Sequence, residues 1–431
     1  MSSVLVIVDL QNDFCDGVLG NKEVGKAMES ISRYILTNKG KYTHYLFTLD
    51  THDKESYNEP FPIHCLKNSH GWHLISPLDR FQNKIEDEYV PHPDVCNNIA
   101  FVEKSAYGAK EEDLINSIPS DANKIHIIGT ATEYCVLENY KLLKKLFPNA
   151  EVAVIEDYCV GIDYVKSKEA LKSMNTISVR FDPETLYNKL IQFIRDRFKN
   201  EFGFNMKAVI GVSGGKDSSV CLKLLVDALG WDKVIPVLIP NGTQNDISCS
   251  YKICEFCDVR PLEVNVGTTY EALSKEIGDK LNISDLPSTY TTNTPARLRM
   301  VVLYGIAAIK GGIVINTCNL SEDYVGYSTK FGDSAGDLSL LSQLTCSEVI
   351  KLGEWMKIPD ELIHKPPSDG MCGKTDEDNL GFTYDMLDFH IRHKCPIPEE
   401  VEKMIEKKHN HGATKHKAKL ILEENVFHIS G

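Results

Sequence analysis

Short apolar runs separated by polar breaks recur through the first half of the chain. They span residues 4–9, 44–50, 99–104, 124–130 and 151–157. Because these runs are rich in β-branched residues and mostly continuous, they predict parallel strands covered on both faces. Between them, residues 134–147 place Val136, Tyr140 and Leu143 on one helical face. The pattern predicts an α/β sheet with helices on both sides.

A second series of the same kind begins after about residue 180. A helical stretch at 184–203 is followed by apolar runs at 207–213, 233–240 and 311–317. Pro183 coincides with the start of that helix, which places a boundary near 178–184. The 431 residues exceed the roughly 250–300 that one core serves. We therefore predict two three-layer αβα domains with mostly parallel sheets, at 1–180 and 181–431.

The charge balance limits the partners. The chain carries 47 Lys and Arg against 61 Asp and Glu, a formal net charge of −14. A nucleic-acid footprint needs a basic face, so the composition argues against nucleic acid as a partner. The N-terminal apolar run stops at Asp9, and no run approaches the roughly 20 residues that cross a bilayer. We expect no membrane partner and interpret the N-terminal run as a buried strand.

The cysteines bear on the cellular compartment. There are 13, an odd number, and they are scattered along the chain. This usage, without a secretory signal, predicts a reducing cytosol and mostly free thiols. Cys254 and Cys257 have the spacing of a redox or zinc site. With no second pair at a suitable distance, two helix-borne thiols are the favoured interpretation.

Chemically versatile residues stand at the ends of the predicted strands. Asp9, Lys104 and the segment 129–135 each follow an apolar run. The carboxyl ends of parallel strands meet at one edge of a sheet, so these side chains are expected to share a crevice. Taken singly, such an Asp caps a helix, such a Lys is solvated and such a Cys packs. Together they suit nucleophilic catalysis, with Cys135 as a thiolate that Lys104 stabilises and Asp9 as the proton carrier.

A metal site is indicated beside this group. Asp50 and His52 lie two apart at a strand end, and His64 follows. Imidazole and carboxylate ligands together suit Zn, Fe or Mn. A further ligand can come from Glu59, His70 or His73, and the sequence does not choose among them.

Five segments in the first half carry a family resemblance. They read, in order, VDLQNDF, DTH, PIHC, KSAYGA and GTATEYCV. Through them, residues 1 to about 180 resemble the nicotinamidases of the isochorismatase-like cysteine hydrolase family. An amidase that acts on another small amide remains the alternative.

The resemblance implies residue roles. Asp9, Lys104 and Cys135 would form the catalytic triad, and Asp50, His52 and His64 would hold the metal that anchors the pyridine nitrogen. A cis peptide at Thr130–Ala131 would aim the amides of Ala131 and Cys135 at the oxyanion. Phe14 and Trp72 are the candidate walls for the substrate ring.

The segment SGGKDSS opens the second series of strands. It is not a Walker A loop, because Asp217 follows the lysine. Its glycines free backbone amides, and Ser213 and Ser218 add hydroxyls at a helix start, which makes a nest for pyrophosphate. Asp217 can hold Mg²⁺. The segment resembles the SGGxDS motif of ATP pyrophosphatases, enzymes with the adenine-nucleotide α-hydrolase-like fold.

Later segments narrow this resemblance. They read PNGTQND, TNTPARLRM, NLSEDYVGYSTKFGDSAGD, KPPSDG and TDEDNLGFTYDMLD. Over about residues 184 to 420 the chain resembles ammonia-dependent NAD synthetases, which implies a homodimer through this half. The implied ATP-binding residues are Ser213, Gly214, Gly215, Asp217, Ser218 and Thr317, with Asp217 and Glu322 at Mg²⁺. The implied dinucleotide-binding residues are Arg297, Lys330, Asp333, Asp337 and His416.

Three positions depart from the family pattern. Cys346 and Ala418 stand where the family usually has Lys and Arg, and Asn316 precedes Thr317 where Gly is usual. Loss of basic residues that face phosphate would lower the rate. Compensation can come from Lys415, Lys417 or Lys419. A weakened, nucleotide-sensing second domain therefore stays open as an alternative.

The two resemblances together predict a bifunctional cytoplasmic enzyme of NAD salvage. The first half would convert nicotinamide to nicotinate and ammonia. The second would use ATP, Mg²⁺ and ammonia to amidate nicotinate adenine dinucleotide, giving AMP and pyrophosphate. Transfer of ammonia between the sites and independent action of two salvage enzymes are both compatible with the sequence.

Overall fold

The computed structural model describes residues 1–20, 22–38, 40–82, 84–85, 88–89, 98–203, 205–365, 376–393 and 397–416. It divides into two compact units. Unit 1 comprises Met1–Arg180 and Phe389–Glu399, and unit 2 comprises Phe181–Asp388 and Glu400–Gly431.

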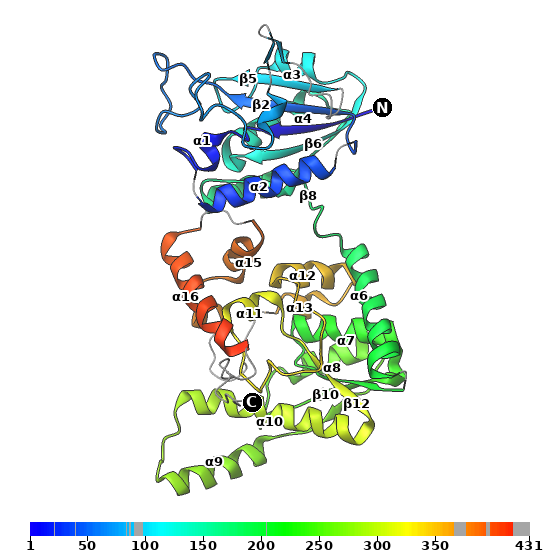
Figure 1. The fold of residues 1–431 in the computed structure, drawn as a ribbon. Coiled ribbons are helices and arrows are strands. Elements are labelled where there is room, and N and C mark those ends of the chain that lie inside the picture. Colours follow the sequence, from blue (N-terminus) through cyan, green and yellow to red (C-terminus); the bar gives the residue numbers. More distant parts are fainter. Residues whose placement is uncertain are drawn as a thin grey trace, which may run out of the picture. The chain divides into compact units, whose positions relative to one another are not determined.

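Unit 1 is built on a six-stranded sheet in which all neighbouring strands are parallel (Figure 1). In the order β5-β2-β1-β6-β7-β8, the strands are Ile99–Lys104, His44–Asp50, Ser2–Val8, Ala122–Thr130, Glu151–Val160 and Thr176–Ile177. The five strands predicted from apolar runs are all present. A short antiparallel pair, β3 (Lys84–Ile85) with β4 (Glu88–Tyr89), lies outside this sheet.

Both faces of this sheet are covered, as the continuous apolar runs predict. On β1, Leu5 and Ile7 pack into the core that helix α2 (Lys22–Thr37) closes. Val4 and Val6 face the opposite core, which α4 (Leu137–Leu146) closes. The remaining helical elements are α1 (Asn12–Cys15), η1 (Asp79–Phe81), α3 (Glu111–Ser117), the π-helical turn η2 (Thr132–Val136) and α5 (Tyr164–Ser173).

Unit 2 is built on a five-stranded parallel sheet. In the order β11-β10-β9-β12-β13, the strands are Leu262–Glu263, Val234–Leu238, Lys207–Gly211, Gly312–Asn316 and Leu338–Ser339. The unit opens with α6 (Pro183–Arg197), whose N-cap Asp182 accepts a hydrogen bond from the Thr185 amide. With its π-helical continuation η3 (Phe198–Phe202), it accounts for the predicted helix at 184–203.

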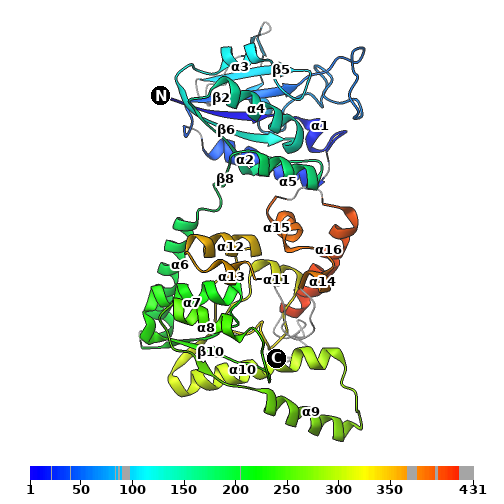
Figure 2. The same cartoon turned by 180° about the vertical axis from the view of Figure 1, so that it is seen from behind.

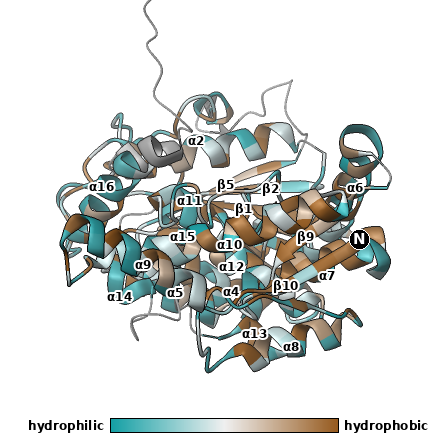
Figure 3. Ribbon diagram, turned by 90° about the horizontal axis from the view of Figure 1, so that it is seen from below, coloured by the Kyte–Doolittle hydropathy of each residue, from teal (hydrophilic) through white to brown (hydrophobic). Residues whose placement is uncertain are grey.

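The helices of unit 2 cover both faces of its sheet (Figure 2). Ala208 and Ile210 of β9 face the core formed with α6 and α7 (Lys216–Leu229), whereas Val209 faces α10 (Ser288–Lys310). In Figure 3 the strands β9 and β10 are brown, and α16 is largely teal. The other helices of unit 2 are η4 (Trp231–Lys233), α8 (Ile247–Phe256), α9 (Gly267–Leu281), α11 (Leu320–Val325), α12 (Cys346–Trp355), α13 (Asp360–Ile363), α14 (Asp376–Leu380) and nearly all of α16 (Glu399–His416). Helix α15 (Tyr384–His393) is divided, because its residues from Phe389 onward belong to unit 1.

The sheet orders locate a crevice in each unit. In unit 1, β1 lies between β2 and β6, and in unit 2, β9 lies between β10 and β12. The chain therefore winds away from the first strand of each unit in both directions. Loops at such a switch point diverge and leave a crevice beyond the carboxyl ends of the strands. The predicted α/β class with two mostly parallel sheets is confirmed.

Two further expectations bear on partners and compartment. Among the described helices, none has the length and apolar content that crossing a membrane requires. The ten cysteines within the described ranges are free, including Cys254 and Cys257.

Candidate functional site

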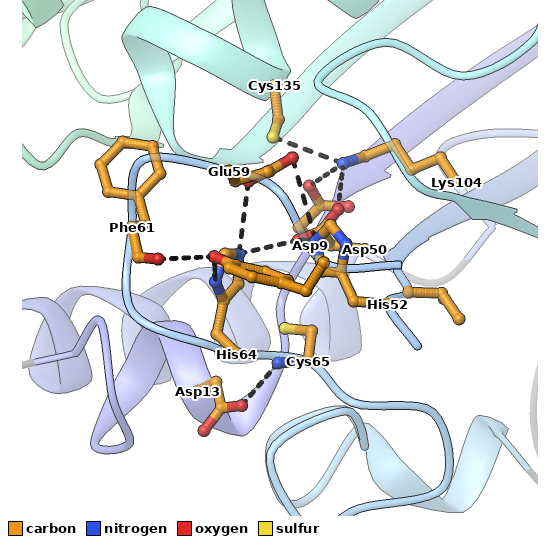
Figure 4. A network of polar contacts seen from close by, with 12 residues as sticks. Asp9, Asp13, Asp50, His52, Glu59, Phe61, His64, Cys65, Lys104 and Cys135 are labelled. Atoms are coloured by element: carbon orange, nitrogen blue, oxygen red, sulfur yellow. Dashed lines mark hydrogen bonds and ion pairs between the residues drawn. The ribbon is translucent and has the colours of Figure 1, made fainter. Parts of the chain in front are cut away.

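Lys104 is the centre of the crevice in unit 1. The register of β2 and β5 sets Asp50 directly beside Lys104, so their side chains lie on the same face of the sheet. The Lys104 ammonium is 2.7 Å from Oδ2 of Asp9 and 3.2 Å from Oδ1 of Asp50. It also donates a hydrogen bond to Sγ of Cys135 at 3.4 Å (Figure 4). All four residues are buried, so the structure brings the three predicted catalytic residues together.

Cys135 is placed by the irregular backbone that follows β6. The Thr130–Ala131 peptide is cis, as the family resemblance implies. The chain then forms η2, which contains Cys135, before α4 begins; π-helical turns are frequent at functional sites. Gly129 has φ +128°, and a Cβ atom there would lie 2.1 Å from the Val8 carbonyl oxygen. Only glycine permits this close approach of β6 to β1.

Asp9 is held in an uncommon conformation. Its φ is +49°, in the left-handed region that residues other than glycine rarely adopt. The Thr48 hydroxyl donates a 2.7 Å hydrogen bond to Oδ1 of Asp9. The other oxygen, Oδ2, pairs with Lys104. The Asp9 carboxylate therefore lies in the crevice at the end of β1, and each of its oxygens has a partner.

The pKa shifts favour a thiol in the resting site. Burial raises the pKa of Cys135 well above its usual value of 9.0, and the nearby Asp9 and Asp50 carboxylates add to this effect. Lys104 lowers the Cys135 pKa but does not outweigh burial. Lys104 remains the one group in this set that favours the thiolate form. Burial also raises the pKa of Asp9, which makes its carboxylate a better acceptor for the thiol proton.

The lysine itself stays charged. Burial acts to lower the pKa of Lys104, but the Asp9, Cys135 and Asp50 charges together raise it well above 10.5. For Asp50, burial acts to raise the pKa, but Lys104 and hydrogen bonds from His52 and His64 lower it overall. The site thus retains one ammonium beside an ionised Asp50.

The predicted metal ligands converge beside Lys104. Nε2 of His52 and Nε2 of His64 lie 3.0 and 3.1 Å from the same oxygen of Asp50. The three ligand atoms all lie within 4.8 Å of one another. Two imidazole nitrogens and one carboxylate directed at one point fit a divalent transition metal. Each oxygen of Glu59 is 4.0 Å from one of the two histidines, whereas His70 and His73 are exposed.

A layer of hydrogen bonds orients these ligands. The Gln11 side chain donates to the Asp50 carbonyl and accepts from the Asp50 amide, each at 2.8 Å. Asp13 accepts a 2.7 Å hydrogen bond from the amide of Cys65, which has φ +46° and follows His64. Nδ1 of His64 lies 2.8 Å from the Pro62 carbonyl. Such partners fix ring orientation and backbone position at metal sites. Gln11 and Asp13 belong to VDLQNDF, but sequence reasoning assigned them no role.

Phe14 and Trp72, the two residues expected to contact the substrate ring, both lie in the core beside the site. The Phe14 ring lies 5.5 Å from that of His64, edge to face. Trp72 is 2% exposed and donates its indole N–H to Thr51, so it packs in the core behind the loop. Three aromatic residues that the sequence analysis did not single out also adjoin the site. Tyr57 packs against His52, Phe61 packs against Tyr134, and Tyr107 packs against Tyr134.

Unit 2 contains a cavity of about 550 Å³ beyond the carboxyl ends of β9, β10 and β12. Its lining includes the predicted residues Ser213, Gly215, Asp217, Ser218, Thr317, Glu322 and Asp333. The hydroxyl oxygens of Ser213 and Ser218 are 3.1 Å apart, across the turn that starts α7. Gly214 has φ +75°, and a Cβ atom there would lie 2.5 Å from the Ser250 amide nitrogen. The turn therefore requires glycine at this position.

Asp217 and Glu322 are two of the acidic residues that line this cavity. Oδ1 of Asp217 accepts a 2.9 Å hydrogen bond from Asn319, and Oδ2 pairs with the Lys216 ammonium at 2.9 Å. Glu322 lies in the first turn of α11, where it forms a capping box with Asn319. Burial, and next the Asp217 charge, raise the pKa of Glu322 well above 4.5. Two neighbouring carboxyl groups at the mouth of a phosphate-binding turn offer the oxygen ligands that suit Mg²⁺.

The other predicted residues of unit 2 have different surroundings. Arg297 is exposed and donates to the Lys330 carbonyl at 3.3 Å, and neither residue lines the cavity. The Asp337 side chain accepts a 2.7 Å hydrogen bond from the Val314 amide, and this bond holds Asp337 beside β12. The His416 side chain and Ala418 lie outside the described residues.

Two further residues of unit 2 adjoin the cavity or the segments around it. Arg299 was not predicted, and Cys346 was noted only as a departure from the family pattern. Arg299 lines the cavity and donates to the Ile239 carbonyl at 3.1 Å, although the sequence analysis did not select it. Cys346 is buried at the first position of α12, whose capping box joins Thr345 and Glu348. Lys417 and Lys419, proposed to compensate for lost basic residues, are not among the described residues.

Comparisons with known proteins agree with this division. The family described as NAD synthase matches residues 186–423, and the isochorismatase domain matches residues 3–181. The ammonia-dependent NAD synthetase of Methanocaldococcus jannaschii is 35% identical over 225 residues, which are 51% of this chain and 85% of that protein. The solved NMN synthetase of Francisella tularensis is 31% identical, with a TM-score of 0.51 over 57% of this chain and 99% of that one. A solved nicotinamidase of Bacillus subtilis is 18% identical, with a TM-score of 0.34 over 41% and 100%.

Proposed function

The chain belongs to the NAD synthase family, and we propose that it is a bifunctional enzyme that releases ammonia from nicotinamide and uses ammonia to form an amide of NAD biosynthesis. Its isochorismatase domain precedes its NAD synthase domain, and both are enzyme domains. The observation that supports the amidase most directly is the contact of Lys104 with Asp9, Asp50 and Cys135 beside two converging histidines.

In the amidase, Cys135 attacks the carbonyl carbon of nicotinamide while its proton passes to Asp9. The C–N bond breaks, Asp9 returns the proton to the nitrogen, and ammonia leaves. Water then attacks the thioester carbon and gives one proton to Asp9. The C–S bond breaks, Asp9 returns that proton to the sulfur, and the acid leaves as nicotinate after losing its remaining proton to solvent. Lys104 stays an ammonium throughout and stabilises whichever neighbour is negative.

The three proposed metal ligands would contribute to substrate binding. Asp50, His52 and His64 would hold Zn, Fe or Mn, with Glu59 near enough to act through a water molecule. When bound, the ion supplies a Lewis acid for the pyridine nitrogen and so orients the ring. Phe14, Phe61 and Tyr107 would enclose the ring, because they adjoin the histidines or the residues beside Cys135.

In the synthetase, the cavity beside the Ser213–Ser218 turn would bind ATP, with Mg²⁺ on Asp217 and Glu322. A carboxylate oxygen of the nicotinate group attacks the α-phosphorus, the bond to the β-phosphate oxygen breaks, and pyrophosphate leaves. Ammonia then attacks the acyl carbon of the adenylate and loses a proton, and AMP leaves. The serines and the α7 amides would hold phosphate oxygens during the first step.

The test is to assay both reactions on one purified protein. Ammonia release from nicotinamide is measured without ATP, and pyrophosphate release is measured with MgATP, ammonium and nicotinate adenine dinucleotide. Turnover in both assays supports the proposal. Amide hydrolysis without pyrophosphate release would favour the alternative of a nucleotide-sensing second domain, which the departures at Cys346 and Ala418 motivate.

A second candidate concerns the substrate of the synthetase. The similarity to an NMN synthetase over 99% of that chain favours amidation of nicotinate mononucleotide instead of the dinucleotide. The same pyrophosphate assay with the two nucleotides as competing acceptors decides between them through the ratio of kcat/KM values.

Coupling of the two reactions is a separate question. The product ammonia of the amidase is the nucleophile of the synthetase, and a protein that supplies both raises its local concentration. With ¹⁵N-nicotinamide and excess unlabelled ammonium, direct transfer gives more labelled product than bulk mixing predicts. Equal labelling would show that the two sites act independently.

Helix α10 supports the proposed homodimer. Val301, Tyr304 and Ile309 form an apolar stripe on its solvent side, and they are 68%, 40% and 81% exposed. An apolar stripe at helical spacing on a 23-residue helix is typical of a covered interface. We expect Ile309→Asp to give a monomer in sedimentation experiments and to leave amide hydrolysis unchanged. A wild-type protein that sediments as a monomer would contradict the dimer.

A further inference from the structure

Lys216 is a buried cation in the wall of the unit 2 cavity. It is the lysine of the SGGKDSS turn and the first residue of α7. Its side chain is 6% exposed, yet it contributes to the cavity lining. Lysine side chains are seldom buried unless they pair with an opposite charge, because removing an ammonium from water is costly.

The surroundings of the amine are mostly acidic. Its Nζ atom lies 2.9 Å from Oδ2 of Asp217 and sits 5.6 Å from the centre of the Tyr384 ring. Glu322 and Cys346 are also close enough for their charges to act on it. The amine therefore contacts one of the two carboxylates that would hold Mg²⁺, and it lies within electrostatic range of the other.

The cavity wall, as far as the structure describes it, contains two other cations, and each has a partner in the protein. Arg299 donates to a backbone carbonyl, and Lys365 is paired with Asp246. Arg299 lies on α10 and Lys365 follows α13, whereas Lys216 lies within the Ser213–Ser218 turn itself. Lys216 is thus the cation nearest to the backbone amides and hydroxyls that suit phosphate.

We propose that Lys216 is a phosphate-binding residue of the nucleotide site, whose ammonium leaves Asp217 for a phosphate oxygen when a magnesium nucleoside triphosphate binds. This inference rests on the proposed nucleotide site of unit 2. Mg²⁺ on Asp217 and Glu322 repels the ammonium and takes its partner, while the triphosphate brings new negative charge. The two positive charges of Mg²⁺ would balance Asp217 and Glu322, so the Lys216 ammonium would be free to interact with phosphate. Its charge would then stabilise the negative charge that accumulates on pyrophosphate as it leaves.

The test compares two probes, MgATP and adenosine, by calorimetric titration of the full chain. Hydrogen bonds to charged groups contribute about 1.5–3 kcal/mol, so Lys216→Met is expected to weaken MgATP binding by about 10- to 100-fold. Adenosine affinity should stay within about twofold, since adenosine has no phosphate. Lys216→Arg should keep most of the MgATP affinity.

Lys223→Met is the matched control. Lys223 lies on the same helix and pairs with Asp227, and it does not line the cavity. Its substitution should leave both affinities unchanged. The double variant Lys216→Met, Cys346→Lys restores a positive charge nearby. It should recover part of the MgATP affinity, because residues 216 and 346 are neighbours.

The outcomes separate this inference from the proposed function. Equal weakening of MgATP and adenosine, or unchanged MgATP affinity in Lys216→Met, would overturn the role of Lys216. A wild-type protein that binds no MgATP would also overturn it. If the wild type binds MgATP but releases no pyrophosphate, the synthetase proposal fails, and the binding comparison still decides the role of Lys216.

Discussion

Each unit buries one lysine beside two carboxyl groups and a cysteine, and the two arrangements differ in how closed they are. Among the described lysines, Lys104 and Lys216 are the buried ones. Lys104 contacts both carboxylates and the sulfur directly, at 2.7, 3.2 and 3.4 Å. Lys216 contacts one carboxylate, at 2.9 Å, and borders a cavity of about 550 Å³.

Under the proposed functions, the difference follows from the charge of the two ligands. A small neutral amide brings no charge of its own, so the first site must contain its own balanced set of charges around the nucleophile. A magnesium triphosphate brings both cation and anion, so the second site needs room and exchangeable partners. Similar residue types therefore take part in different chemistry. Substitutions of the corresponding residues, Cys135 and Cys346 or Lys104 and Lys216, should have unequal effects on activity and stability.

The largest contrast is expected at the two cysteines. Cys135→Ala should lower the rate of ammonia release by roughly 10⁴-fold or more, because loss of the nucleophile removes the covalent route. Cys346→Ala should change pyrophosphate release by less than about threefold, since Cys346 serves packing at the start of α12. Steady-state assays of both reactions check this. A small effect of Cys135→Ala on ammonia release would refute the amidase mechanism.

Next in size is the effect of Lys104 on stability. Lys104→Met leaves Asp9 and Asp50 buried without their cation, and breaking such a buried pair costs about 3–5 kcal/mol. We expect a loss of this size in the free energy of unfolding measured with urea. Lys216→Met should cost less, because Asp217 keeps its hydrogen bond from Asn319. Equal losses for the two variants would contradict the distinction between a closed and an open site.

A smaller effect is expected from the hydrogen bonds behind the metal ligands. Gln11→Leu removes the clamp on the Asp50 backbone, and loss of such partners typically costs about 10- to 100-fold in metal affinity. Competition with a zinc indicator measures the change. MgATP binding by the same variant should match wild type, and a parallel loss there would point to general unfolding.

The smallest effect concerns pH and lies in unit 1 alone. His126 is buried and accepts or donates a 2.7 Å hydrogen bond with Tyr42, and burial lowers its pKa below 6.5. The unfolded chain then binds the proton more tightly, so the His126 contribution to stability is present above pH 6.5 and is lost as pH falls through the folded pKa. Melting temperatures between pH 7 and 5 should fall less steeply for His126→Gln. An identical slope in both proteins would exclude this residue as the cause.

Much of the unit 1 site was predictable because parallel strands impose order. Apolar runs identify the strands, and residues just past their ends share one edge, which is why Asp9, Lys104 and Cys135 could be grouped across a hundred residues. Gln11 and Asp13 could not be predicted in the same way. Their partners lie in the loop around His64 and Trp72, and the path of that loop follows no periodic pattern.

Unit 2 shows where a motif match stops being sufficient. Arg297 and Arg299 lie two apart on α10, so they point about 200° apart around the helix. Arg299 shares a face with Leu303 and Ala307, which pack on the sheet, whereas Arg297 shares a face with the exposed Val301. Both faces are apolar in sequence, so the pattern alone cannot tell which arginine faces the cavity.

The Gln11 clamp has a consequence for transplanting the proposed metal site into another protein scaffold. The Asp50 main chain is held at both its amide and its carbonyl by one side chain, so the geometry of the proposed ligands depends on residues outside the ligand set. A graft of Asp50, His52 and His64 alone would copy the donor atoms and lose their alignment. The smallest portable motif is the five-residue set that adds Gln11 and Asp13.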